Sequence, residues 1–363
     1  MNAITLPVMR PRLPSADQVL PYLRRIDAAR WYSNFGPLAQ ELEARMAVRW
    51  GMSPACALSL SSATSGLSVA LMAAQAPVGS LCLIPSWTFV ATAHAVMQAG
   101  LTPFLCDVDE RTGTLTPALA EAALAAAPAA VGAAMPVCPF GAAIDWEGWA
   151  EFRRRTGLAV VVDAAAAFDT VRPGPLPTVI SLHATKVLAA GEGGLLLCED
   201  GELIIRARRH ANFGFFGDHR SQVRATNAKM SEYHAAVGLA SLDDWPNIRA
   251  TWQGALGRVQ AAARAIPHRW PAGLGEDYVC SSPSIRVADA AALAGRLRAE
   301  GIEARQWWRG GIGSHPAFAA LPAMDLPATA ALARSTLALP CWPDLDVAAA
   351  GRLGEALARH GAG

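Results

Sequence analysis

Short apolar runs alternate with alanine- and leucine-rich helical patterns from about Cys56 to Cys198. Runs such as Leu81-Cys-Leu-Ile84 and Leu158-Ala-Val-Val-Val-Asp163 have the length and composition of buried strands. Strands that alternate with helices are typical of a parallel sheet, because each helix carries the chain back to the same edge. The alternation therefore predicts an α/β fold with a doubly wound, mainly parallel sheet.

The pattern changes beyond Leu239, where we expect a second, smaller unit. A long helical pattern over residues 243–266 leads through a Pro/Gly-rich connection into a strand-like run, Ser284-Ile-Arg-Val287, and a helix over residues 289–300. A chain of 363 residues also exceeds the usual size of one domain. We therefore expect an N-terminal segment and large domain in residues 1–240 and a small C-terminal α/β domain in residues 241–363.

Lysine is rare in this chain, because only Lys186 and Lys229 are lysines among its 31 basic residues. Lys186 follows the strand-like run Thr178-Val-Ile-Ser-Leu-His183 and lies shortly before Gly191-Glu-Gly-Gly194. Its motif is Ser181-Leu-His-Ala-Thr-Lys186. A lysine amine attacks aldehydes when its surroundings lower its pKa from about 10.4, and enzymes that use pyridoxal phosphate (PLP) need one such amine. Lys186 is the candidate. His183 is either a group that orients or relays protons or a hydrogen-bonded core residue, and Lys229 is either a surface or interface cation or a phosphate contact.

Asp163 ends the strand-like run that precedes the lysine motif. The carboxyl ends of parallel strands meet at one edge of the sheet, where ligands of open α/β sheets bind. A carboxylate at this edge is suited to hold the pyridine nitrogen of PLP in its protonated form. An aspartate in this place is also a common helix cap or turn residue, so its assignment depends on the lysine that follows.

Two further stretches are candidates for contacts with the phosphate and the ring. Ser59-Leu-Ser-Ser-Ala-Thr-Ser-Gly-Leu67 places small hydroxyl residues at the expected start of a helix, where anions bind, although an ordinary helix cap gives the same pattern. Pro85-Ser-Trp-Thr-Phe-Val-Ala-Thr92 places aromatic residues where a strand meets a helix. One of them is suited to stack on a pyridine ring, and core packing is the alternative.

Together, in this order, the motifs resemble those of the DegT/StrS-type sugar aminotransferases, a family of fold type I PLP enzymes. The resemblance spans nearly the whole chain. Besides the stretches above, it rests on Trp31-Tyr-Ser-Asn-Phe-Gly-Pro37, Asp163-Ala-Ala-Ala-Ala167, Asn227-Ala-Lys-Met-Ser-Glu232, His315-Pro-Ala-Phe318 and Leu337-Ala-Leu-Pro340.

The resemblance implies roles for individual residues. Lys186 would form the internal aldimine and carry a proton between the donor and the cofactor, and Asp163 would pair with the pyridinium. The remaining cofactor contacts would be Ala63, Thr64 and Ser181 at the phosphate, Phe89 on the ring, and Asn227 across a dimer interface. The role of Asn227 across the interface implies a homodimer with shared active sites.

The implied reaction moves an amino group from glutamate or glutamine to a nucleotide-linked keto sugar by a ping-pong mechanism. A lysine at position 186, where the dehydratases of the family have histidine, favours transamination. Ala166 stands where the family has a glutamine near the ring hydroxyl, and Cys138-Pro-Phe140-Gly141 also departs from the family pattern. These departures imply a differently shaped substrate. One alternative is an aminotransferase that acts on a cyclitol or another non-nucleotide ketone. The other is a PLP-binding regulatory protein without turnover.

Composition argues against other classes of function. The net charge of +1 offers no basic footprint for nucleic acid or a membrane surface, and no metal-ligand spacing occurs. The alanine-rich stretch of residues 118–143 is interrupted by Glu121, Pro128 and Pro136, which argues against a membrane span. Seven scattered cysteines and an N-terminus unlike a signal peptide indicate a cytoplasmic protein with reduced thiols.

Overall fold

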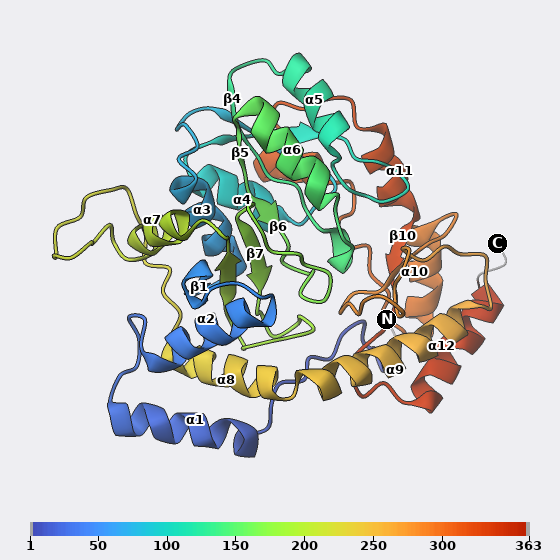
Figure 1. Ribbon diagram of the computed structural model, residues 1–363. Helices are drawn as coiled ribbons and strands as arrows, with labels where there is room; N and C mark the ends of the chain where they lie inside the picture. The colour runs from blue at the N-terminus through green and yellow to red at the C-terminus, as the bar shows by residue number, and fades with distance from the viewer. Residues whose placement is uncertain (1–2, 361–363) are drawn as a thin grey trace.

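The computed structural model describes residues 3–360, and a continuous central sheet organises their larger part (Figure 1). Its strands lie in the order β1-β8-β7-β6 and β5-β4-β2-β3. β5 and β6 are two pieces of one strand that joins these sets, because Val161 between them donates its N–H to the Ala134 carbonyl, 3.0 Å away. The strands are β1 (Ala57–Leu60), β2 (Leu81–Pro85), β3 (Thr102–Cys106), β4 (Val131–Ala134), β5 (Ala159–Val160), β6 (Val162–Asp163), β7 (Thr178–Ser181) and β8 (Gly194–Leu197).

The sheet is mainly parallel, as the alternation of strands and helices predicts. β2 is parallel to β3 and β4, β4 to β5, and β6 to β7, whereas β8 runs antiparallel to both β7 and β1. The strand expected to reach His183 ends at Ser181, because His183 pairs instead with Gly191 in the turn that follows. Asp163 and Ser181 thus lie at the carboxyl ends of adjacent strands.

Helices cover both faces of the sheet, which confirms the doubly wound architecture. Alternate strand residues point into two hydrophobic cores, so Val160 and Ile180 lie in one core and Val161 and Val179 in the other. The first core is shared with α2 (Pro37–Arg49), α5 (Pro117–Ala126), α6 (Trp146–Thr156) and α8 (Glu232–Asp243). The second is shared with α3 (Ala63–Ala73), α4 (Val90–Gln98) and α7 (Gly201–Ala211). α1 (Ala16–Ala29) packs outside α8.

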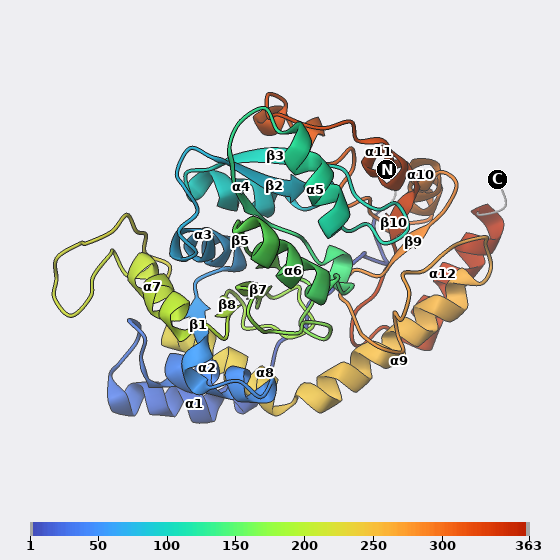
Figure 2. The same ribbon diagram turned by 45° about the horizontal axis from the view of Figure 1, so that its top comes forward.

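The C-terminal part has a small sheet of its own, in which β10 (Thr336–Ala338) pairs antiparallel with β9 (Ser284–Arg286). Around it lie α9 (Trp245–Ala263), α10 (Ala290–Ala299), α11 (Pro327–Ser335) and α12 (Val347–His360). Figures 1 and 2 both show α9 and α12 packed side by side. A division of the chain at residue 240 stays a prediction.

Half-buried polar contacts fix the C-terminal part against the large sheet. Asp107, directly after β3, accepts hydrogen bonds from the Ala328 and Thr329 N–H groups at the start of α11, both at 2.8 Å. Asp169 forms an ion pair with Arg249 at 2.9 Å and accepts the Val279 N–H at 3.0 Å. These contacts place residues 279–308 opposite the carboxyl edge of the sheet.

Candidate active site

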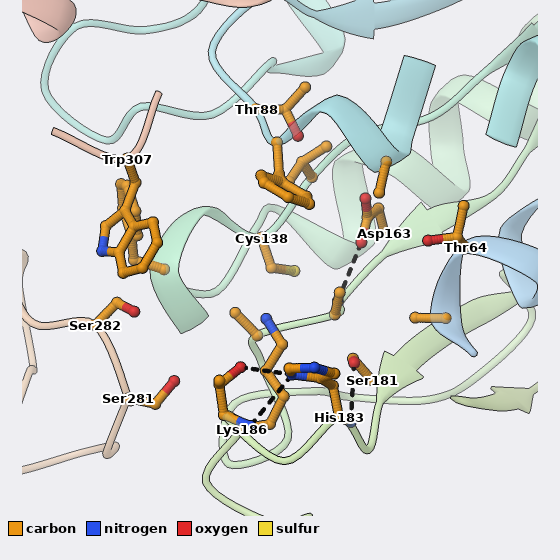
Figure 3. Close-up of a pocket in the computed structure, with 18 of the residues that line it drawn as sticks. Thr64, Thr88, Cys138, Asp163, Ser181, His183, Lys186, Ser281, Ser282 and Trp307 are labelled. Carbon is orange, nitrogen blue, oxygen red and sulfur yellow. Dashed lines mark hydrogen bonds between the residues drawn. The ribbon is translucent and has the colours of Figure 1, made fainter. Parts of the chain in front are cut away.

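A cavity of about 540 Å³ lies between the carboxyl edge of the large sheet and the C-terminal part. Its size is within the range of small-molecule sites, roughly 300–1,000 Å³. In Figure 3, Asp163, Thr64 and Ser181 lie on one side of this space and Trp307, Ser281 and Ser282 on the other. Six of the seven residues predicted from the sequence line the cavity: Ala63, Thr64, Phe89, Asp163, Ser181 and Lys186.

Asp163 is a buried carboxylate with only neutral hydrogen-bond donors. Its side chain accepts the Thr92 hydroxyl at 2.8 Å and the Ala165 N–H at 3.1 Å, and the residue is 5% exposed. Burial raises the pKa of this carboxyl group, while Thr92, Ala165 and the more distant Lys186 oppose the shift. A cation placed against Asp163 would compensate for the buried negative charge.

Lys186 reaches the same cavity from a turn closed by backbone hydrogen bonds. The Ala184 N–H donates to Gly191, and the Lys186 N–H donates to His183, at 2.8 and 2.9 Å. Burial lowers the pKa of the Lys186 amine, and Asp163 acts in the opposite direction. A lowered pKa increases the fraction of neutral, nucleophilic amine.

The N-terminus of α3 forms the anion-binding side of the cavity. Ser62 caps the helix by accepting the Ser65 N–H at 3.1 Å, so the expected helix cap is present at the same place as the predicted phosphate site. The first N–H groups of a helix lack partners within the helix and attract anions. Gly194 lies so close to this turn that a Cβ atom there would approach the Ser62 backbone to 2.6 Å, which explains a glycine at this position.

Phe89 offers an aromatic surface to the cavity. It directly precedes α4 and, although large and apolar, is 54% exposed, whereas Trp87 in the same stretch is buried in the core. Charge and shape together fit PLP. A pyridinium would compensate Asp163, a phosphate would receive the N–H groups of α3 and the Ser181 hydroxyl, an aldehyde would meet the Lys186 amine, and the ring would lie against Phe89.

A comparison with protein families gives this arrangement its context. The sequence model of the DegT/DnrJ/EryC1/StrS aminotransferase family matches residues 15–358. The chain belongs to this family. The aminotransferase class and the family expected from the sequence are therefore confirmed.

Relatives within the DegT/DnrJ/EryC1/StrS aminotransferase family act on nucleotide sugars according to their names. A dTDP-4-amino-4,6-dideoxy-D-glucose transaminase of Shigella dysenteriae is 32% identical over 65% of this chain, and the match spans 64% of that relative. A UDP-N-acetyl-3-dehydro-alpha-D-glucosamine 3-aminotransferase of Acidithiobacillus ferrooxidans is 28% identical over 96% of this chain and 95% of its own. The crystal structure of DesI with its TDP-sugar product has a TM-score of 0.85, is 29% identical, and covers 99% of this chain and 93% of its own. This similarity confirms fold type I.

Three further candidate residues, Asn227, Lys229 and His183, lie in different surroundings. Asn227 is exposed, forms a bridge with Asn212, and does not line the cavity of its own chain, so its role across an interface stays a prediction. Lys229 is half-buried with its amine 4.3 Å from the centre of the Phe213 ring. His183 is half-buried and lines the cavity, with its Nδ1 atom 2.8 Å from the Thr185 hydroxyl, which contradicts the core alternative.

Sequence reasoning missed the wall opposite Asp163 and the hydroxyl that holds Asp163. Thr92, whose hydroxyl donates to Asp163, lies in the stretch whose aromatic residues suggested ring stacking. The opposite wall includes Ser281, Ser282, Trp307 and Trp308. The adjacent tryptophans Trp307 and Trp308 were a signal in the sequence that could have pointed to this wall.

The described residues contain neither a candidate metal site nor a candidate membrane span. Between residues 3 and 360, His, Cys, Asp and Glu form no group of three or more suited to hold a metal ion. In the same range, no helix combines the length and apolar character needed to cross a bilayer.

Proposed function

We propose that this protein is a PLP-dependent aminotransferase that transfers the amino group of glutamate or glutamine to a nucleotide-linked keto sugar. The observation that carries the proposal is the arrangement of Lys186 and Asp163. One is an amine with a lowered pKa, the other a buried carboxylate, and both line one cavity beside the N-terminus of α3. This is the arrangement that PLP chemistry requires.

Bound PLP supplies an electron sink that stabilises negative charge at the carbon next to the transferred nitrogen. The Lys186 amine would hold the cofactor and would move the proton at that carbon. Asp163 keeps the pyridine nitrogen protonated, and Thr92 and the Ala165 N–H hold its carboxylate in place. Ala63, Thr64 and Ser181 bind the phosphate, and Phe89 orients the ring.

A single lysine serves both halves of a ping-pong cycle. Lys186 is the only lysine among the residues that line the cavity, so the donor and the acceptor use it in turn. The names of the relatives support a nucleotide-linked acceptor, and Ala166 and Phe140 in the cavity wall support a difference in its shape. A cyclitol or another non-nucleotide ketone is the alternative acceptor.

The assembly and location of the protein belong to the same proposal. We place Asn227 in the active site of a partner subunit, which makes the enzyme a homodimer with shared sites. Exposed aromatic residues near this segment, Phe213, Phe216 and Tyr233, support a covered surface there. The seven cysteines are free and buried, which supports a cytoplasmic location.

The test follows nitrogen from donor to acceptor. Enzyme loaded with PLP is incubated with ¹⁵N-labelled glutamate or glutamine and either dTDP-4-dehydro-6-deoxy-D-glucose or an inosose, and the product is analysed by mass spectrometry. We expect ¹⁵N in the sugar nucleotide and, in Lys186→Ala, no transfer. Label only in the inosose would select the alternative acceptor. A cofactor that no donor converts would select the regulatory protein without turnover.

A further inference from the structure

The cavity has a second wall that the proposed cofactor contacts leave free. Cofactor contacts come from the large sheet and its helices, whereas Ser281, Ser282 and Trp307 come from the C-terminal part and lie across the space (Figure 3). Figure 3 also shows the six-membered ring of the Trp307 indole toward the space and its nitrogen on the far side. This wall therefore offers an apolar aromatic face beside two hydroxyl groups.

Trp307 is held in place through its contact with Arg305, which also lines the cavity. Arg305 exchanges two backbone hydrogen bonds with Ala338 of β10, at 2.9 and 3.0 Å, so the chain leading to Trp307 is fixed to a strand. The Arg305 guanidinium lies 4.5 Å from the centre of the Trp307 ring and forms an ion pair with Glu303. Glu303 in turn accepts the Val8 N–H at 3.0 Å. A side chain fixed in this way is pre-organised for binding.

A stacked aromatic pair lines the cavity together with Trp307. Phe140 and Trp308 stack with ring centres 4.1 Å apart, and Trp87 contacts Trp308 edge-on at 5.2 Å. Phe140 has a positive φ of 52°, a conformation that costs energy for any residue other than glycine. Such strain persists where the surroundings enforce it, and here it places an aromatic ring in the cavity lining.

The hydroxyl groups of Ser281 and Ser282 point into the cavity in Figure 3. Within residues 3–360 neither hydroxyl takes part in a protein hydrogen bond, although their neighbour Ser284 donates to the Ser282 carbonyl at 3.1 Å. Both hydroxyls are therefore available to a ligand as donors and acceptors. An aromatic face with hydroxyl groups at its edge is complementary to a ring that carries C–H groups on its face and hydroxyl groups around it.

We propose that Trp307, Ser281 and Ser282 form the specificity site that binds the ring of the acceptor. Trp307 packs on one face of the ring and excludes water from it. Ser281 and Ser282 bind ring hydroxyl groups and set which carbon faces Lys186. This inference rests on the proposed aminotransferase function and adds the residues that select the acceptor.

The experiment measures binding by isothermal titration calorimetry to wild-type enzyme carrying PLP, a form that has no amino group to transfer to a ketone. The probes are dTDP-4-dehydro-6-deoxy-D-glucose, an inosose, and 2-oxoglutarate as an open-chain keto acid. We expect Trp307→Ala to weaken binding of a ring ketone about tenfold and Trp307→Phe about threefold. Ser281→Ala and Ser282→Ala should each weaken it about fivefold. Binding of 2-oxoglutarate should change less than twofold in all four variants.

Trp270→Phe is the matched control, because Trp270 is half-buried beside His268 and does not line the cavity. It should bind every probe as the wild type does. The proposal is overturned if neither ring ketone binds wild-type enzyme, or if Trp307→Ala binds the ring ketone with unchanged affinity. It is also overturned if the variants weaken the binding of the ring ketone and of 2-oxoglutarate equally. The reaction of bound PLP with L-glutamate tests the proposed function separately, since it needs no ring acceptor.

Discussion

Replacement of Asp163 by asparagine separates the chemistry of the site from the stability of the fold. Asparagine keeps the shape of the side chain, and its carbonyl oxygen still accepts the Ala165 N–H. Its amide nitrogen replaces the oxygen that accepts the Thr92 hydroxyl at 2.8 Å. Thr92 also contacts the Thr88 hydroxyl at 2.8 Å, so a rotation of its hydroxyl hydrogen restores a complete hydrogen-bond network.

The expected magnitudes follow from this geometry. Two hydrogen bonds to a carboxylate contribute about 3–6 kcal/mol, and burying one ion costs several kcal/mol, so the two nearly cancel. We expect the free energy of unfolding of the cofactor-free protein to change by less than about 2 kcal/mol. Because burial raises the pKa of Asp163 in the folded protein, wild-type stability relative to the variant should fall as pH rises from 3.8. Turnover should fall by about 10²–10³, the usual loss for one pre-organised electrostatic contact.

Steady-state transamination and urea unfolding of the cofactor-free protein measure the two quantities. Asp169→Asn is the matched control, because Asp169 is also a buried carboxylate, paired with Arg249 outside the cavity. That variant should lose about 1–3 kcal/mol of stability and keep turnover within about threefold. If Asp163→Asn keeps wild-type turnover while Asp169→Asn behaves as stated, Asp163 does not act on the cofactor.

Three further outcomes are expected. The rate of PLP attachment to cofactor-free protein should rise with pH and level off at a pH below the ordinary lysine pKa of about 10.4, because burial lowers the pKa of Lys186. A rate that levels off only at the ordinary lysine pKa would contradict this. Ser181→Ala should weaken PLP binding about fivefold by equilibrium dialysis, and an unchanged affinity would exclude the phosphate contact. Ala166→Gln should raise the acceptor KM while PLP binds at least as tightly, and an unchanged KM would show that this space is not used.

Strand positions were predictable from the sequence because buried strands need continuous apolar runs. The runs that contain Asp163 and Ser181 lie side by side in the structure, as expected for strands that bring Asp163 and Lys186 to one edge of the sheet. It did not specify that β8 alone runs antiparallel among the strands of the large sheet, since direction depends on how the Lys186 turn folds back. The ends of the strands also shifted by one or two residues where turns compete for backbone hydrogen bonds.

The wall opposite Asp163 was beyond sequence reasoning for a physical reason. Ser281, Ser282 and Trp307 lie in connecting segments, whose positions depend on the pairing of β9 with β10 and on Asp107 capping α11. Local patterns do not encode such distant contacts. Asn227 presents a different limit, because its predicted role depends on a second chain.

The most direct test of the central claim is the visible absorbance spectrum of the protein with PLP, before and after addition of L-glutamate or L-glutamine. The account predicts an absorbance band of lysine-bound PLP that either donor converts to the shorter-wavelength pyridoxamine form. It predicts the same initial band in Lys229→Ala and none in Lys186→Ala, so the chain's two lysines supply both the test and its control. A protein that forms no such band, or that forms it without Lys186, would contradict the claim.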